Sequence, residues 1–342
     1  MKIRSLKLTN VRSFLQTQEL ELKSNISIVV GPNGGGKTNL LETLSYVLRE
    51  KLMSPFHGYF SQPEGKFSVA HPMSNNVPLE KNFKGLQTDQ TLCVVMESTE
   101  SDIENIRLMK RDLQKWMTKH NVNYYSPIND IHWENDNIKA GDRFNLEIIN
   151  GNVVNFPEGD FGVYLRYFYV DRVLRNYEQK NALQVPFISL PVSRSSGDFQ
   201  SVVTLSQINI VEMRQSTFGM NTPSGGPRGF VPLAIAQLSE TLRNLELQHG
   251  DNAFKVLSRD NNIQGFTKAL RSIGYEWNLV CVNSIMNSYT LELSKQGLSF
   301  KLANASSGER ELITFLLAIY ILNVRDAFII VDEPELHLHP RW

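Results

Sequence analysis

The chain has 342 residues, of which 41% are hydrophobic and 20% are charged, and 35 basic side chains balance 35 acidic ones. This size allows one large or two ordinary domains with a sizeable core, and the even charge excludes a strongly basic nucleic-acid binder as the overall class. The sequence contains no apolar run of the roughly 20 residues that span a membrane, and its N-terminus lacks the apolar core of a signal peptide. It therefore predicts a cytoplasmic protein with no membrane partner.

The front of the chain predicts two strands and then a phosphate-binding loop. KIRSLKLTNVRSF has apolar residues near period two, which favours a strand. The run NISIVV, residues 25–30, is short and β-branched, so we expect a strand buried on both faces of a parallel sheet. GPNGGGKTNLLETLSYVLRE follows directly and contains the pattern G-x-x-x-x-G-K-[ST] between a predicted strand and a predicted helix.

This glycine-rich loop predicts a nucleotide site. Glycines let successive backbone N–H groups point at phosphate oxygens, and the following helix adds the positive end of its dipole. Lys37 is expected to reach the β- and γ-phosphates of ATP and to act in catalysis, and Thr38 is expected to bind Mg²⁺. The predicted nucleotide-binding residues of the loop are Gly31, Pro32, Asn33, Gly34, Gly35, Gly36, Lys37, Thr38 and Asn39.

The middle of the chain mixes strand and helix patterns. Residues 51–90 read as loop with short strands, and aromatic and β-branched residues predict strands at 91–98, 143–151 and 163–172. Residues 103–120 have helical spacing, with Ile103, Ile106, Leu113 and Trp116 as the inward positions. The basic side chains of this helix are interpreted as a solvated face, with phosphate contact as the alternative: Lys110, Arg111, Lys115 and Lys119.

A further strand is predicted at 186–194, followed by Ser-, Gly- and Pro-rich loops. From Pro232 to about Ile273 the pattern becomes helical, and we expect two or three helices that project as an arm.

The predicted organisation has four segments. They are 1–50 with the P-loop, 51–200 as a β-rich lobe, 201–280 as the helical arm, and 281–342 as the second part of the ATPase core.

The back of the chain predicts a second phosphate-binding device and an acidic pair. Two short strands surround Lys295–Gly297, and a Ser/Gly loop beginning at Ser306 then opens an apolar helix. The apolar run in DAFIIVDEPE predicts a strand that ends at Asp332 and Glu333. Beside a P-loop, Asp332 is expected to hold Mg²⁺ and Glu333 to polarise an attacking water.

The order of P-loop, ASSGE and IIVDEPELHLHP resembles the ABC-type ATPase heads of the SMC, RecF and OLD group. Within that group, DEPELHLHP is typical of OLD-like bacterial ATPases, many of which serve in defence against phage. The resemblance covers about 1–50 and 285–342. It implies an α/β P-loop NTPase fold with a mixed or antiparallel β subdomain and a helical arm insertion.

The resemblance also implies a mechanism. Two heads would pair face to face around ATP, and Ser306 and Gly308 of one head would contact the γ-phosphate held by the P-loop of the other. Glu333 would activate water, so ATP would hold the heads together until hydrolysis separates them. The implied partners are a second copy of the chain and an effector, expected to be a nuclease domain or subunit, with DNA as a possible further partner.

Some positions depart from the family pattern or are left open. The signature reads A-S-S-G-E instead of beginning with Leu and carrying Gly at its third place, so Ala305 and Ser307 differ while Ser306 and Gly308 remain. Three glutamines are candidates for the Q-loop: Gln200, Gln207 and Gln215. Arg194 resembles an arginine of OLD-like heads, and His337 and His339 are assigned to a D-loop at the dimer seam instead of to a metal.

The sequence leaves more than one function open. Its end just after Glu333 leads us to expect an interrupted chain, because the family continues with further core strands and a switch histidine. The first hypothesis is an ATP-hydrolysing head that regulates an effector in bacterial defence or repair. The alternative is a nucleotide-gated protein-binding module with little turnover, and a transporter subunit is disfavoured by the long stretch between Lys37 and Ser306.

Overall fold

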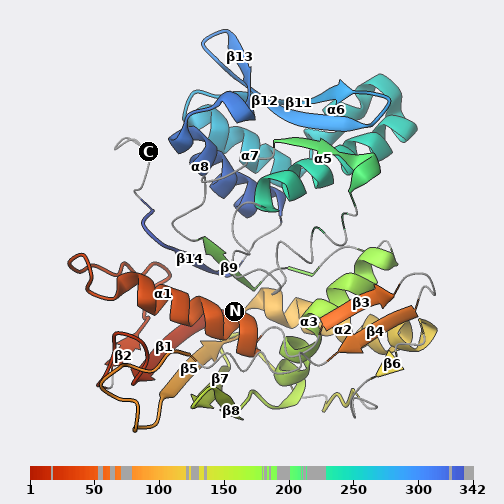
Figure 1. Ribbon diagram of the computed structural model, residues 1–342. Helices are drawn as coiled ribbons and strands as arrows, with labels where there is room; N and C mark the ends of the chain where they lie inside the picture. The colour runs from red at the N-terminus through yellow and green to blue at the C-terminus, as the bar shows by residue number, and fades with distance from the viewer. Residues whose placement is uncertain are drawn as a thin grey trace. The chain divides into compact units, whose positions relative to one another are not determined.

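The computed structural model describes residues 1–16, 18–52, 57–61, 66–70, 79–120, 123–124, 131–134, 137–178, 180, 183–184, 186–190, 201–208, 210, 213, 229–322 and 326–334. The chain divides into two compact units (Figure 1). Unit 1 comprises Met1–Ile188 and Asp326–Ile330, and unit 2 comprises Ser189–Arg325 and Val331–Trp342. The four segments inferred from the sequence stay a prediction.

Unit 1 contains an antiparallel sheet with the strand order β2-β1-β5-β7-β8. Its strands are β1 (Lys2–Thr9), β2 (Gln18–Glu21), β5 (Thr91–Glu97), β7 (Arg143–Ile149) and β8 (Asn152–Asn155). Every second residue of β5 is buried, so the sheet turns one face to the core. The strand predicted in KIRSLKLTNVRSF and the strands predicted at 91–98 and 143–151 are therefore confirmed.

The helices of unit 1 are α1 (Lys37–Tyr46), α2 (Glu100–Lys119) and α3 (Gly159–Tyr177), and a π-helical turn at Val47–Leu52 continues α1. Helix α2 begins with a capping box in which Thr99 and Asp102 bond each other's backbone N–H groups. Ile106, Leu113 and Trp116 are buried as predicted, while Ile103 is half-buried.

Two smaller sheets contain the remaining described strands that lie wholly or partly in unit 1. Strands β3 (His57–Ser61), β4 (Lys66–Ala70) and β6 (Asn123–Tyr124) form one of them. In the other, β14 (Phe328–Val331) pairs with β9 (Phe187–Leu190), and the Phe328 N–H donates to the Pro186 carbonyl at 2.9 Å. The strands predicted at 186–194 and before Asp332 are confirmed at β9 and β14.

Two strand predictions for unit 1 are wrong. Residues 25–30 form no strand, and Ile26, Ile28 and Val30 are 78%, 81% and 84% exposed. An apolar run becomes a buried strand only where neighbouring strands bond its backbone, and no described strand pairs with this one. The other error is 163–172, which lies within α3. Its aromatic and β-branched residues bury a helical face against α2 and the sheet, so packing overrides their strand propensity.

Unit 2 is built on an antiparallel sheet in which β12 (Ser288–Lys295) lies between β10 (Val202–Thr204) and β11 (Glu276–Asn283), and β13 (Leu298–Lys301) also pairs with β12. Its helices are α5 (Phe230–His249), α6 (Ala253–Leu257), α7 (Asn261–Ser272) and α8 (Ser307–Leu316), and α8 continues as a π-helical turn, Leu317–Ile321. The strands around Lys295–Gly297 and the helix after the Ser/Gly loop are confirmed.

The helices expected between Pro232 and Ile273 exist, but they pack on the sheet instead of projecting from it (Figure 1). The first half of α5 is buried on nearly every side. In α7, Phe266 packs edge-on against Trp277 of β11 with ring centroids 5.2 Å apart. The Trp277 indole N–H also donates to the Thr267 hydroxyl at 2.9 Å. These apolar faces are too extensive for a free arm in water.

The basic face of α2 is mostly neutralised by carboxylates. Lys110 pairs with Asp160, Arg111 with Asp112, and Lys119 with Glu178. These contacts favour the interpretation of an ordinary charged surface over one that binds phosphates. No helix in the described part of the chain has the length and apolar character that a membrane crossing requires.

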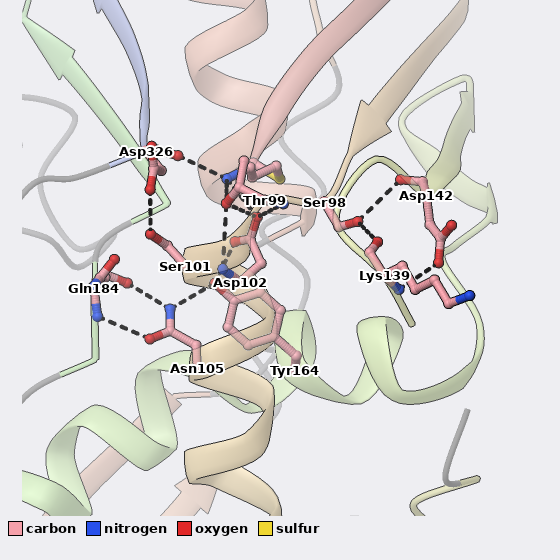
Figure 2. Close-up of polar contacts among 11 residues, drawn as sticks. Ser98, Thr99, Ser101, Asp102, Asn105, Lys139, Asp142, Tyr164, Gln184 and Asp326 are labelled. Carbon is pink, nitrogen blue, oxygen red and sulfur yellow. Dashed lines mark hydrogen bonds and ion pairs between the residues drawn. The ribbon is translucent and has the colours of Figure 1, made fainter. Parts of the chain in front are cut away.

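A buried polar network joins the elements of unit 1 (Figure 2). The Asp102 carboxylate pairs with the α-amino group of Met1 at 2.6 Å and accepts the Tyr164 hydroxyl of α3 at 3.0 Å. The same amino group donates to the Asp326 carbonyl at 3.0 Å, and the Ser101 hydroxyl donates to the Asp326 carboxylate at 2.8 Å. The network therefore ties the residue that precedes β14 to β1 and α2.

A second buried charge cluster joins α2 and α3. Arg175 donates to Asp171 at 2.5 Å and to Asp112 at 3.2 Å, and its guanidinium lies 4.8 Å from the centre of the Trp116 ring. Burial raises the pKa of Asp171 to about 7, although Arg175 favours the ionised form. One guanidinium shared by two carboxylates cannot fully compensate the deeper of them.

This cluster predicts a pH-dependent stability. The pKa of Asp171 in the folded protein lies above the unfolded value of 3.8. The protonated carboxyl therefore contributes to the free energy of unfolding fully below about pH 4, and this contribution is lost as the pH rises through 7. Between pH 5 and pH 8 we expect the free energy of unfolding to fall by an amount on the order of 1–4 kcal/mol. Urea unfolding at the two pH values measures it.

Asp171→Asn should remove most of this decrease, whatever its effect on absolute stability. Asp251→Asn changes an exposed aspartate and serves as the matched control. Equal pH dependence in the wild type and in Asp171→Asn would contradict the assignment.

Candidate nucleotide-binding site

The P-loop is a tight, exposed turn between residues 31 and 36. The Gly35 N–H donates to the Pro32 carbonyl at 3.0 Å, which closes the turn. Gly34 and Gly36 have φ angles of 77° and 86°, a left-handed conformation that suits glycine. A Cβ on Gly36 would lie 2.7 Å from the Ser13 hydroxyl oxygen and 3.3 Å from the Phe14 ring. The loop thus has the compact backbone that a phosphate-binding turn needs.

Helix α1 begins directly at this loop without a side-chain cap. Its N-cap residue is Gly36, and the described first turn contains no acidic side chain. The first N–H groups of a helix need an acceptor, and their dipole favours a negative charge. An anion at the loop would satisfy both requirements, so these residues fit the phosphates of a nucleotide.

Lys37 lies over the loop. Its ammonium group donates to the carbonyls of Gly31 at 2.8 Å and Pro32 at 3.0 Å. Those contacts hold the positive charge beside the first turn of α1, and the ammonium keeps a third hydrogen for a phosphate oxygen. The predicted contact of Lys37 with the phosphates stays a prediction.

Residues that follow β1 border the P-loop, and the sequence interpretation did not single them out. Asn39 donates to the Ser13 hydroxyl at 3.1 Å, and Arg12 pairs with Glu42 of α1 at 2.5 Å. Ser13 and Phe14 also restrict the space at Gly36. Ser13 and Lys37 are far apart in the sequence, so the contact of the loop with this turn comes only from the tertiary fold.

The signature loop of unit 2 is held by a capping box. Ser306 is the N-cap of α8, and its hydroxyl oxygen accepts the Glu309 N–H at 3.3 Å. In return the Glu309 carboxylate accepts the Ser306 N–H at 2.7 Å. The Ser306 oxygen thus acts as an acceptor and its hydroxyl hydrogen remains to be donated, while Gly308 is buried behind it.

The acidic motif follows β14. Asp332 is buried, and Glu333 is exposed with a φ of 45°. A left-handed glutamate is unusual, and the following Pro334 disfavours the right-handed helical conformation at this position.

The predicted site residues are divided between the two units. The P-loop belongs to unit 1, while Ser306, Gly308, Asp332 and Glu333 belong to unit 2. Gln207 is exposed in a 3-10 turn, Leu205–Gln207. The remaining candidates lie outside the described residues: Arg194, Gln200, Gln215, His337 and His339.

A family model described as the RecF/RecN/SMC N terminal domain matches residues 2–341. The chain belongs to this family. Its fold is therefore the P-loop α/β fold of SMC- and RecF-like ABC-type heads, as the sequence predicted. The comparisons do not distinguish the OLD-like branch.

Two curated relatives each match this chain over 58 residues. The identity is 31% with the chromosome partition protein Smc of Lactiplantibacillus plantarum and 34% with that of Xanthomonas oryzae pv. oryzae. Each match covers 17% of this chain and 5% of the relative. The chain thus matches only a small part of the length of these relatives.

Solved SMC heads are similar at low identity. One is the Smc head domain from Pyrococcus furiosus bound to the C-terminal domain of ScpA, at 12% sequence identity. The match covers 98% of this chain and 83% of that chain, with a TM-score of 0.43. Another is the SMC head domain from Thermotoga maritima, with 15% identity, coverages of 97% and 78%, and a TM-score of 0.31.

The geometry at Gly36 predicts a graded loss of nucleotide affinity. Gly36→Ala places a Cβ at 2.7 Å from Ser13 in a left-handed conformation, so we expect the affinity for ATP to fall about tenfold or more. Gly34→Ala is the matched control, because it has the same φ strain and no described atom lies within 4 Å of the added Cβ. Calorimetric titration with ATP measures both.

Ser13→Gly in the Gly36→Ala background should restore part of the affinity by relieving the clash. An equal loss in Gly34→Ala and Gly36→Ala would mean that the contact with Ser13 does not shape the loop.

Proposed function

We propose that this chain is an ATP-dependent head that pairs with a second copy of itself around ATP and hydrolyses the nucleotide. The observation that carries this proposal is the start of α1, where a glycine loop replaces a side-chain cap and Lys37 supplies a positive charge. Such a helix end accepts phosphate and offers little to other ligands. Membership in the RecF/RecN/SMC family supports ATP as the nucleotide.

The residues of the chain would divide the chemistry among them. The loop N–H groups and Lys37 bind and orient the phosphates, and Glu333 orients the attacking water and takes its proton. Thr38 and Asp332 would hold Mg²⁺, which would neutralise charge at the phosphates. These roles follow from the motif and the family resemblance.

The signature loop supports pairing of two heads. The Ser306 oxygen is fixed as the acceptor of the Glu309 N–H, so its hydroxyl hydrogen and the N-terminal N–H groups of α8 can be donated to a phosphate oxygen. In the proposed dimer, Ser306 and Gly308 of one head contact the γ-phosphate on the P-loop of the other. Nucleotide binding and pairing would then be thermodynamically linked.

The finer parts of the proposal rest on the sequence resemblance of DEPELHLHP. We propose a cytoplasmic OLD-like head that regulates an attached or partner effector, a nuclease, in bacterial defence or repair. DNA is a further proposed partner. None of the described residues is assigned a role in cutting DNA.

Two substitutions test the core of this proposal. Glu333→Gln should lower phosphate release at least ~100-fold, because the general base is removed, and should increase the ATP-bound dimer. Lys37→Ala should abolish both ATP binding and pairing. Phosphate release and sedimentation velocity with and without ATP measure these effects, and Lys84→Ala, an exposed lysine elsewhere in unit 1, is the control.

The outcomes separate the two functional hypotheses. ATP-dependent pairing that Lys37→Ala leaves unchanged would overturn the proposal. Pairing that requires Lys37 but releases no phosphate above the level of Glu333→Gln would favour the nucleotide-gated binding module.

A further inference from the structure

A chain of polar contacts lies behind the signature loop of unit 2. One oxygen of the Glu309 carboxylate accepts the Ser306 N–H at 2.7 Å, and the other accepts the Tyr275 hydroxyl in a short hydrogen bond. The Tyr275 oxygen in turn accepts a hydrogen from the Lys295 ammonium at 2.8 Å. Lys295, Tyr275 and Glu309 are thus connected in series to Ser306, and we call this series the signature relay.

The signature relay is built on regular elements. Tyr275 directly precedes β11 and is 1% exposed, and Lys295 is the last residue of β12. The Tyr275 N–H donates to the Leu270 carbonyl of α7 at 3.0 Å, and its ring lies 6.5 Å from that of Phe300 in β13. The hydroxyl is therefore fixed by the packing of three strands and a helix, which makes it a precise support for the signature loop.

The relay also pairs charges. Lys295 is half-exposed, and its ammonium lies 4.4 Å from the centre of the Tyr275 ring. Burial works to raise the pKa of Glu309, but hydrogen bonds from Tyr275 and Ser306 outweigh it and hold that pKa below its usual value. The hydrogen bond to Tyr275 raises the pKa of Lys295. At neutral pH the carboxylate is therefore ionised and the ammonium is protonated.

A negative carboxylate at this position creates an electrostatic difficulty. The Glu309 carboxylate that accepts the Ser306 N–H is ionised at neutral pH, and a phosphate that approaches Ser306 carries charge of the same sign. The nearby ammonium of Lys295 offsets that repulsion, and Tyr275 connects it to the carboxylate. The P-loop has no such conflict, because the described first turn of α1 lacks an acidic residue.

We propose that Tyr275 and Lys295 are positioning residues for Ser306. Tyr275 holds the capping box, and Lys295 offsets the charge of Glu309. The signature loop can then accept the phosphate of a nucleotide bound to a second head. This inference rests on the proposed function and names the residues behind its dimer contact. The relay serves the engagement of the second head, and nucleotide binding to the P-loop is independent of it.

The test uses the Glu333→Gln protein with ATP, in which the paired state accumulates. Tyr275→Phe removes the hydroxyl from the relay, and Lys295→Met removes the charge. Each substitution should lower the association constant of the dimer about tenfold, because a charge-assisted hydrogen bond is lost. The affinity of the P-loop for ATP, titrated at protein concentrations where the chain is monomeric, should change by less than about twofold.

Rescue and salt dependence separate a positioning role from a structural one. Lys295→Arg keeps the charge and a donor, so it should restore most of the pairing. High salt should reduce the difference between Lys295→Met and its parent, because screening weakens the same repulsion. The matched controls are Lys301→Met, an exposed lysine of β13, and Tyr289→Phe, a buried tyrosine of β12 whose hydroxyl is not part of the relay.

The outcomes are distinguishable. If Tyr275→Phe and Lys295→Met pair with ATP as well as the Glu333→Gln parent, the inference is wrong and the proposed function stands. If the parent itself does not pair with ATP, the proposed function fails and the inference fails with it. If Tyr275→Phe lowers the melting temperature, the pairing of Lys295→Met decides whether the inference holds. The Lys295 side chain is half-exposed, so its removal leaves the core intact.

Discussion

The buried carboxylate of Asp102 is the contact on which the arrangement of unit 1 depends. A buried charge without partners costs several kcal/mol, so the elements that compensate it must stay in place. Here the compensation comes from Met1 at the start of β1, from Thr99 at the start of α2 and from Tyr164 of α3. Through the Met1 amino group the same network reaches Asp326, the residue that leads into β14 and the acidic motif (Figure 2).

The same local device, a capping box, serves different purposes in the two units. At Thr99 the acidic partner is sealed in the core and stabilises the fold. At Ser306 the acidic partner is Glu309, which lies close to the surface where the proposed function requires a phosphate, so its charge needs the compensation that Lys295 and Tyr275 provide. The first turn of α1 has neither an acidic side chain nor a side-chain cap, so it can accept an anion directly. The three helix starts therefore differ in how their first N–H groups and any nearby acidic side chain are satisfied.

The predictions from sequence succeeded where a residue's role is set within a few neighbours and failed where it is set by packing. The turn at Gly34 and Gly36, the start of α8 at Ser306 and the end of β14 before Asp332 all follow from local pattern. The run at 25–30 looks like a buried strand, but a strand needs bonded neighbours that no local pattern guarantees. Residues 163–172 have strand-like composition, and only their burial against α2 selects the helix.

The sequence alone determined the RecF/RecN/SMC family, because the glycine loop, the Ser/Gly signature and the acidic pair each need particular residues at fixed spacing, and such spacing is visible in a linear sequence. Tertiary structure decided how those motifs are supported. The contact of Ser13 with Gly36 and the relay from Lys295 through Tyr275 to Glu309 join residues that are distant in the chain. Hydrogen bonds and charge compensation act through space over about 3 Å, so they depend on how strands and helices pack and are not encoded in any short stretch of sequence.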